Sequence, residues 1–293
     1  MTPAAKYAYA LHPYGIGASV IVLVSIIILT LINKKFTDKM AIRLIFSISL
    51  ANLVSHLSEY FSVLNGGLAL GSTKCATVNG LRLFSRTFYA FTYISASLHL
   101  FRSFAQSKKS NLKSEITIWT GTVILSGVFT AIYWALGAFS GKLNKVGCNP
   151  GADNFTTNLI FYLTVGSVDL LAIISGIYTF YARSKFNRRV TQISFNVDPS
   201  ETVVGSFYYP LTTAITLPFE AGFLFFQAFG IFAWALTIPM AVTMALSGVF
   251  TAILFVSDTS VQEAFVTAYF YFTGQRIINQ AVNNISASTP LLQ

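Results

Sequence analysis

The sequence predicts an all-α membrane protein: a seven-transmembrane helix bundle with the N-terminus outside and a short amphipathic eighth helix. Apolar residues make up 54% of the 293 residues and charged residues only 10%, whereas a soluble domain has about 25% charged residues. The charges gather in short segments between long uncharged runs, and most basic residues fall in alternate loops. This pattern indicates a multi-pass protein of the plasma membrane, in contact with the lipid bilayer.

Seven apolar runs are long enough to cross a hydrocarbon core of about 30 Å, which needs about 20 helical residues. An extracellular tail, residues 1–13, precedes them. The predicted spans are residues 14–32, 41–64, 75–101, 116–139, 159–181, 203–229 and 231–256. Residues 203–256 are too long for one span, and Gly230 is the best candidate for the turn within them. Residues 182–202 are predicted to form the longest polar loop.

The lysines and arginines set the predicted orientation. Most of them lie on the side of the first loop, residues 33–39, so the positive-inside rule places the N-terminus outside and the C-terminus in the cytoplasm. Cys75 and Cys148 then both lie at the outer surface, where a disulfide can form, although two unrelated thiols remain the alternative. Asn154 begins an Asn-Phe-Thr sequon on the same side and is predicted to be glycosylated.

A short amphipathic helix is predicted over residues 257–274, followed by a cytoplasmic tail at residues 275–293. Ser260 and Glu263 have the spacing of a capping box. Apolar residues then recur at helical intervals, which favours a helix lying on the inner leaflet.

Five charged side chains lie within predicted spans at similar depth: Glu59, Arg82, Arg86, Asp169 and Glu220. An unpaired charge costs about 3 kcal/mol at the centre of a membrane helix, so these side chains must pair with each other or meet water. His56 shares one face of the second span with Glu59. Two interpretations stay open: an internal ion network, or a hydrated pocket in which these six residues bind a ligand.

The layout resembles that of a G-protein-coupled receptor. Ser49-Leu50-Ala51-Asn52-Leu53 resembles the Leu-Ala-x-x-Asp segment of rhodopsin-like receptors, with Asn52 in place of the acid. Residues 246–258 resemble the end of the seventh helix in fungal and slime-mould receptors of the cyclic-AMP-receptor-like and carbon-sensing type, with Thr251 in place of an asparagine. The Asp-Arg-Tyr triplet of the third helix is absent, and Arg102 is displaced from its place.

This resemblance implies a receptor that transmits the binding of a small, polar or anionic extracellular ligand to a heterotrimeric G protein, with no cofactor or metal. The implied switch and hinge positions are Asn52, Pro218, Thr251 and Asp258. Pro218 should kink the sixth helix, so that its cytoplasmic half can swing outward. The implied G-protein contacts are Arg102, Arg183, Lys185, Arg188 and Arg189. Attraction to anionic lipid explains the last four equally well.

Other function classes fit less well. The net charge of +9 comes with no basic domain that would indicate nucleic acid. A retinal-binding pump or sensor needs a lysine in the last span, and residues 231–256 contain none. The sequence has no motif of an intramembrane enzyme, and His12, His56 and His99 lie far apart along it. A proton-coupled or uncoupled transporter is the main alternative, because buried acids and arginines suit proton coupling, although no internal repeat is found.

Overall fold

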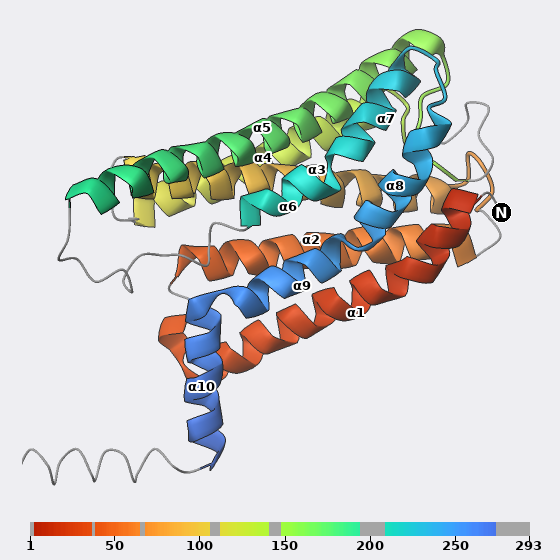
Figure 1. Ribbon diagram of the computed structural model, residues 1–293. Helices are drawn as coiled ribbons and strands as arrows, with labels where there is room; N and C mark the ends of the chain where they lie inside the picture. Colours follow the sequence, from red (N-terminus) through yellow and green to blue (C-terminus); the bar gives the residue numbers. More distant parts are fainter. Residues whose placement is uncertain are drawn as a thin grey trace, which may run out of the picture.

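The computed structural model describes residues 3–36, 39–64, 68–105, 112–140, 148–193 and 209–273. Helices occupy most of these residues and form an elongated bundle (Figure 1). They are α1 (Pro3–Ile32), the short 3-10 helix η1 (Lys34–Phe36), α2 (Met40–Leu64), α3 (Thr73–Ala105), α4 (Leu112–Ala135), α5 (Phe155–Ile193), α6 (Tyr209–Thr216), α7 (Pro218–Ala228), α8 (Trp234–Ala245), α9 (Ser247–Ser257) and α10 (Thr259–Thr273).

The described helices of the bundle form seven rods. Helices α6 and α7 together make one interrupted rod, and helices α8 and α9 together make another. The first pair breaks at Leu217, directly before Pro218, and the second breaks at Leu246 with a bend of 45°. Within the described residues, length and apolar composition mark α1, α2, α4, α5 and the bent pair α8 and α9 as able to cross a membrane. The helix α3 does not meet that measure, and it is the one that carries Arg82 and Arg86.

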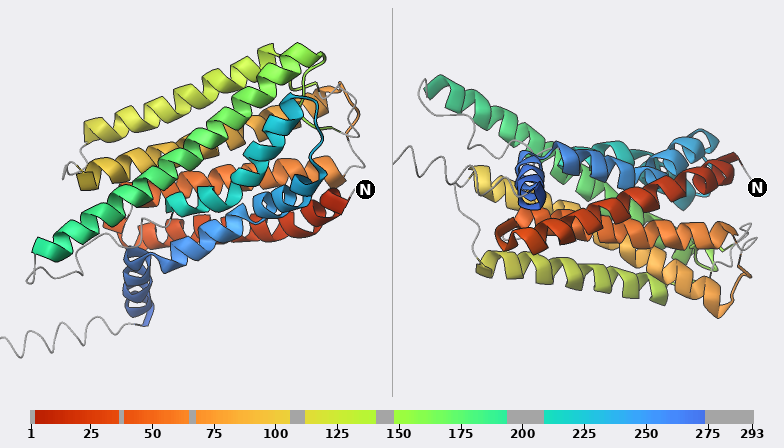
Figure 2. Two further views of the ribbon diagram at one scale, coloured as in Figure 1. Left: turned by 45° about the horizontal axis from the view of Figure 1, so that its top comes forward. Right: turned by 90° about the horizontal axis from the view of Figure 1, so that it is seen from below.

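The helix α3 runs through the bundle and packs against α2, α4, α5 and α6 (Figure 2). Its side chains Ala90, Thr92 and Tyr93 are fully buried. Helices α1, α4 and α5 instead expose apolar side chains such as Ile21, Ile124 and Leu171 over one face. The polar residues of α3 are therefore turned toward protein, while the outer helices present an apolar surface suited to lipid.

Two helices extend beyond the predicted spans. The helix α1 begins at Pro3, so the first span starts within the predicted tail of residues 1–13. The helix α5 continues to Ile193, beyond the predicted end of the span at residue 181. The basic residues after that span therefore lie on a helix, and the predicted polar loop over residues 182–202 is wrong as far as Ile193. The predicted start of the sixth span, residues 203–208, lies outside the described residues. Gly230, between α7 and α8, has a φ of 76°, the left-handed conformation that glycine adopts without strain.

A disulfide joins Cys75 at the start of α3 to Cys148 after α4, as predicted. Both cysteines are buried, and Ser62 of α2 donates a hydrogen bond to the Cys148 carbonyl oxygen at 3.1 Å. Asn79 of α3 donates to the Phe139 carbonyl oxygen at 3.1 Å. These contacts fix the segment that precedes α5 onto the ends of α2 and α3.

The helix α10 leaves the bundle at an angle from the end of α9 (Figure 1). It begins at Thr259, and the Asp258 carboxylate accepts a hydrogen bond from the Ser260 backbone N–H at 2.9 Å. The predicted capping box is therefore wrong: Ser260 lies inside the first turn, and Asp258 provides the cap. Val261 and Ala268 are buried, whereas Phe272, one turn further along the same face, is exposed.

Helices α1 and α9 approach each other through two glycines. A Cβ atom added to Gly248 would lie 2.5 Å from the Gly15 carbonyl oxygen and 2.7 Å from Ser19 Oγ. A Cβ added to Gly15 would collide with the Ala245 carbonyl oxygen in the same way. Because these contacts involve backbone atoms, the helices cannot accommodate a side chain without moving apart.

We expect Gly248→Ala to destabilise the protein by about 1–3 kcal/mol, the usual cost of overpacking. The matched control is Gly127→Ala on α4, where a Cβ meets nothing within 4 Å. It should leave stability unchanged or slightly increased, because alanine favours helix over glycine. Thermal unfolding midpoints of the two variants in detergent test this expectation. Equal midpoints for wild type and both variants would contradict the close contact of α1 with α9.

Candidate functional site

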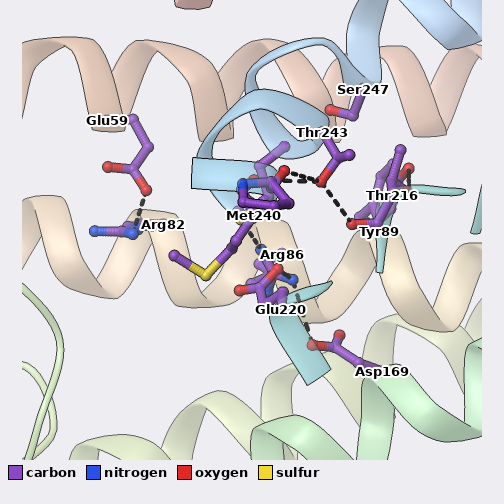
Figure 3. A network of polar contacts seen from close by, with 12 residues as sticks. Glu59, Arg82, Arg86, Tyr89, Asp169, Thr216, Glu220, Met240, Thr243 and Ser247 are labelled. Carbon is purple, nitrogen blue, oxygen red and sulfur yellow. Dashed lines mark hydrogen bonds and ion pairs between the residues drawn. The ribbon is translucent and has the colours of Figure 1, made fainter. Parts of the chain in front are cut away.

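All five predicted membrane-embedded charges are paired with one another (Figure 3). Arg82 of α3 forms an ion pair with Glu59 of α2. One turn further along α3, Arg86 forms ion pairs with Asp169 of α5 and with Glu220 of α7, and its Nη2 lies 3.3 Å from Asp169 Oδ2. The structure therefore shows the internal ion network, the first of the two interpretations that the sequence left open.

The two ion clusters differ in burial. The Arg82 side chain is 20% exposed, and its Nη1 also lies 3.4 Å from Asn149 Oδ1 in the segment held by the disulfide. The side chains around Arg86 are less than 10% exposed. Arg86 Nη1 also lies 3.3 Å from the sulfur of Met244 on α8. Arg86 thus holds α3, α5, α7 and α8 together in the interior, while Arg82 lies toward the disulfide.

A second polar cluster joins α1, α2 and α9. His12 Nδ1 lies 3.0 Å from His56 Nδ1, and His56 Nε2 lies 3.4 Å from Ser247 Oγ. Ser247 Oγ donates to Asn52 Oδ1 at 2.9 Å, and Asn52 Nδ2 donates to Thr251 Oγ1 at 3.2 Å. All five side chains are buried, so hydrogen bonding within the cluster replaces their contacts with water.

The donor and acceptor of each hydrogen bond in this cluster can be assigned in turn, starting from Thr251. Thr251 Oγ1 donates to the Ser247 carbonyl oxygen, so it accepts from Asn52 Nδ2. This sets the orientation of the Asn52 amide, whose oxygen accepts the Ser247 hydroxyl proton. Ser247 Oγ is then left to accept from His56 Nε2–H, and His56 Nδ1 must accept from His12 Nδ1–H. In a neutral pair, the two histidines therefore have opposite tautomers.

A small cavity lies between the two clusters. Its volume is about 30 Å³, enough for about two water molecules but far below the roughly 300 Å³ of a small-molecule site. Its polar lining includes His12, Asn52, His56, Arg86, Tyr89 and Ser247. Tyr89 OH lies 3.3 Å from Thr216 Oγ1 of α6, which also lines the cavity. The cavity therefore connects the Arg86 ion cluster with the histidine cluster.

The predicted switch residues fall in different places. Asn52 and Thr251 are in direct contact within the histidine cluster. Pro218 is the first residue of α7 and follows the break at Leu217, two positions before Glu220. Asp258 caps α10 and lies away from both clusters. Among the predicted ligand-binding residues, Arg86 and His56 line the cavity, and the others contact the arginines as described above.

The predicted contacts with a G protein lie on the ends of α3 and α5, away from the disulfide. Arg102 Nη1 donates to Ser114 Oγ at 3.0 Å, and Lys185 is exposed. Arg183, Arg188 and Arg189 lie on α5, and their side chains are outside the described residues. Asn154, the predicted glycosylation site, is exposed at the start of α5.

His12 and Ser247 were not among the predicted site residues. His12 was expected in an extracellular tail and the histidines far from each other, whereas the structure places His12 in α1 with 4% exposure. One signal was present: Ser247 and Thr251 are four residues apart in an apolar segment, so they form a polar face that matches the Asn52 and His56 face of α2.

No family model matches the sequence, and no curated protein matches it either. Among solved structures, squid rhodopsin is similar, with a TM-score of 0.61 and 14% sequence identity. The similarity covers 93% of this chain and 87% of that chain. At this identity it shows the fold: the chain has a rhodopsin-like seven-helix fold, which confirms the predicted fold class and its multi-pass membrane character. The resemblance to fungal and slime-mould receptors gains no support from it.

The hydrogen-bond directions predict the tautomers of two histidines. We expect a proton on Nδ1 of His12 and on Nε2 of His56, which ¹⁵N solid-state NMR of histidine-labelled protein can distinguish. Only three histidines contribute to the spectrum. Ser247→Ala removes the acceptor for His56 Nε2–H and should change the His56 signals while His99 stays unchanged. Finding His56 with its proton on Nδ1 in the wild type would contradict the assigned directions.

Proposed function

We propose that this protein is a G-protein-coupled receptor that responds to a small polar or anionic extracellular ligand. One observation carries the proposal: within a rhodopsin-like fold, buried polar clusters link the disulfide end of the bundle to the breaks in its last two rods. Glu220 lies just after the break at Leu217, and Ser247 lies just after the break at Leu246. A change at either cluster therefore acts on a position where the helix is already interrupted.

Arg82 is the proposed first contact for the ligand. It is the more exposed of the two buried arginines and lies toward the disulfide, beside Asn149. A guanidinium binds a carboxylate or phosphate through paired hydrogen bonds, so an anionic ligand can replace Glu59 at Arg82. Glu59 on α2 would then lose its partner Arg82 on α3, within electrostatic reach of Arg86, which lines the cavity.

The breaks provide the proposed moving parts. Proline lacks a backbone N–H and weakens the helix at the preceding turn, so α6 can tilt relative to α7. The 45° bend between α8 and α9 gives the last rod a second such point. Ligand binding would shift the population toward a state in which the inner ends of the fifth and sixth rods move apart. The basic residues Arg102, Arg183, Lys185, Arg188 and Arg189 would then border the site for the G protein.

A proton-coupled transporter is the second candidate, favoured by one observation. Arg86 faces two buried acids, an arrangement that suits binding and release of a proton. The cavity beside it holds only about two waters, which is too small for a larger substrate. Coupling to a G protein distinguishes the two functions.

Purified protein in lipid nanodiscs, mixed with a panel of heterotrimeric G proteins, tests the proposal. We expect a stable complex with at least one α-subunit class in the absence of nucleotide, and its dissociation when GTP is added. A G protein that cannot bind GTP is the control for non-specific attraction to the basic surface. The absence of a nucleotide-sensitive complex with every class would contradict the receptor function and favour transport.

The ligand contact is tested with Arg82→Gln in cells that display the variant at their surface. We expect the potency of an active ligand to fall at least about tenfold, because a hydrogen bond to a charged group contributes roughly 1.5–3 kcal/mol. The matched control is Arg43→Gln, which removes another arginine–glutamate ion pair, the one between α2 and Glu115 of α4. Equal potency for both variants would exclude Arg82 as a ligand contact.

A further inference from the structure

The buried ion clusters contain one more acid than arginine. Arg82 and Glu59 balance each other one to one. Arg86 is shared by Asp169 and Glu220, so this group of three carries a charge of −1 if both acids are ionised. The remaining ion pair among the described residues, between Arg43 and Glu115, is also one to one. One negative charge therefore lacks a partner in a region where charge is costly.

The geometry places both acids at one nitrogen atom. Asp169 Oδ2 and Glu220 Oε2 both approach Nη2 of Arg86, while Nε of Arg86 has no hydrogen-bond partner among the described residues. Two carboxylates that bound opposite edges of the guanidinium would each use different N–H groups. Here both acids approach the same nitrogen. Two negatively charged oxygens that converge on one donor repel each other, and a proton on one of them removes that repulsion.

In the part of the chain that the structure describes, the neighbouring helices offer no free cation to balance the charge. The titratable groups near Arg86 are His12 of α1, His56 and Glu59 of α2, Arg82 and Tyr89 of α3, and Tyr133 of α4. Arg82 is already paired with Glu59. The histidines lie on the other side of the cavity from the acids and are hydrogen-bonded to each other. The two acids are themselves the nearest groups that can take up a proton.

We propose that Asp169 and Glu220 together bind one proton beside Arg86, so that the group of three is neutral in this state. The proton comes from water and forms an O–H bond on one carboxyl oxygen, and the net charge changes from −1 to zero. Such a pair titrates as a unit, so the site belongs to both residues. Glu220 lies in the first turn of α7, where the helix dipole favours a carboxylate, which makes Asp169 the main carrier of the proton.

Infrared spectroscopy of the full-length protein in nanodiscs at neutral pH tests the proton directly. A protonated carboxyl group gives a C=O stretching band that an ionised carboxylate lacks and that shifts in D₂O. We expect this band in the wild type. Because charge balance requires the proton only when both acids are present, Asp169→Asn alone and Glu220→Gln alone should each abolish the band. The control Glu115→Gln, in the separate Arg43 ion pair, should retain it.

Stability as a function of pH gives a second, independent readout. The unfolded chain releases both protons above about pH 6, whereas the folded pair retains one. Folding then takes up one proton, so the unfolding equilibrium constant should rise about tenfold per pH unit. The window from about pH 7.5 to pH 8.5 lies a full pH unit above the usual pKa of histidine and below that of tyrosine. Unfolding in a denaturing detergent should show this slope in the wild type and Glu115→Gln, and no slope in Asp169→Asn or Glu220→Gln.

Two results would overturn the proposal. The first is a wild type with no carboxyl band at neutral pH, which needs no variant to fold. In that case, a histidine imidazolium signal in ¹⁵N NMR at the same pH would place the proton at His12 or His56. The second is a band that persists in both single variants, which would assign it to another acid. None of these readouts depends on coupling to a G protein. The proton site and the receptor function are therefore tested independently of each other.

Discussion

The need to pair charge inside an apolar bundle shapes this protein more than any other constraint. Arg86 lies deep in α3, which packs against α2, α4, α5 and α6, and it binds acids from α5 and α7. Because a buried guanidinium without a carboxylate is strongly unfavourable, these contacts determine how α5 and α7 are rotated about their axes. The apolar side chains that face lipid impose no comparable requirement on rotation.

Part of the fold and of the site followed from the sequence because membrane insertion has simple physical requirements. Long apolar runs must be helices, the basic loops indicate an orientation, and two cysteines on one side of the membrane can meet. The same reasoning predicted that the five buried charges would pair with each other or meet water. The match of Glu59 to Arg82, and of two acids to Arg86, did not follow, because it depends on helix rotation and on the depth of each residue.

Other features were hidden for identifiable reasons. Hydropathy detects the part of a helix that lies in lipid, so it could not show that α5 continues through a polar segment of the sequence to Ile193. His12 was assigned to a tail because it precedes the uncharged run rich in Ile and Val that begins at Tyr14, yet the close contact at Gly15 brings α1 against α2 and α9. The break at Leu246 has no proline or glycine at that position, and the nearest such residue, Gly248, serves the contact with α1.

Asn154 combines a sequon with a helix cap. Its side-chain oxygen accepts hydrogen bonds from the backbone N–H and the hydroxyl of Thr157 at 2.8 and 2.9 Å, while a sugar would attach through the amide nitrogen. A glycan on this residue would project from a rigid helix start, with its first sugar held in a fixed direction beside the disulfide-linked segment. Removing the sequon by substituting Asn154 would also unravel the first turn of α5. Substitution of Thr156 separates the two roles, because it eliminates the acceptor sequence and leaves the cap intact.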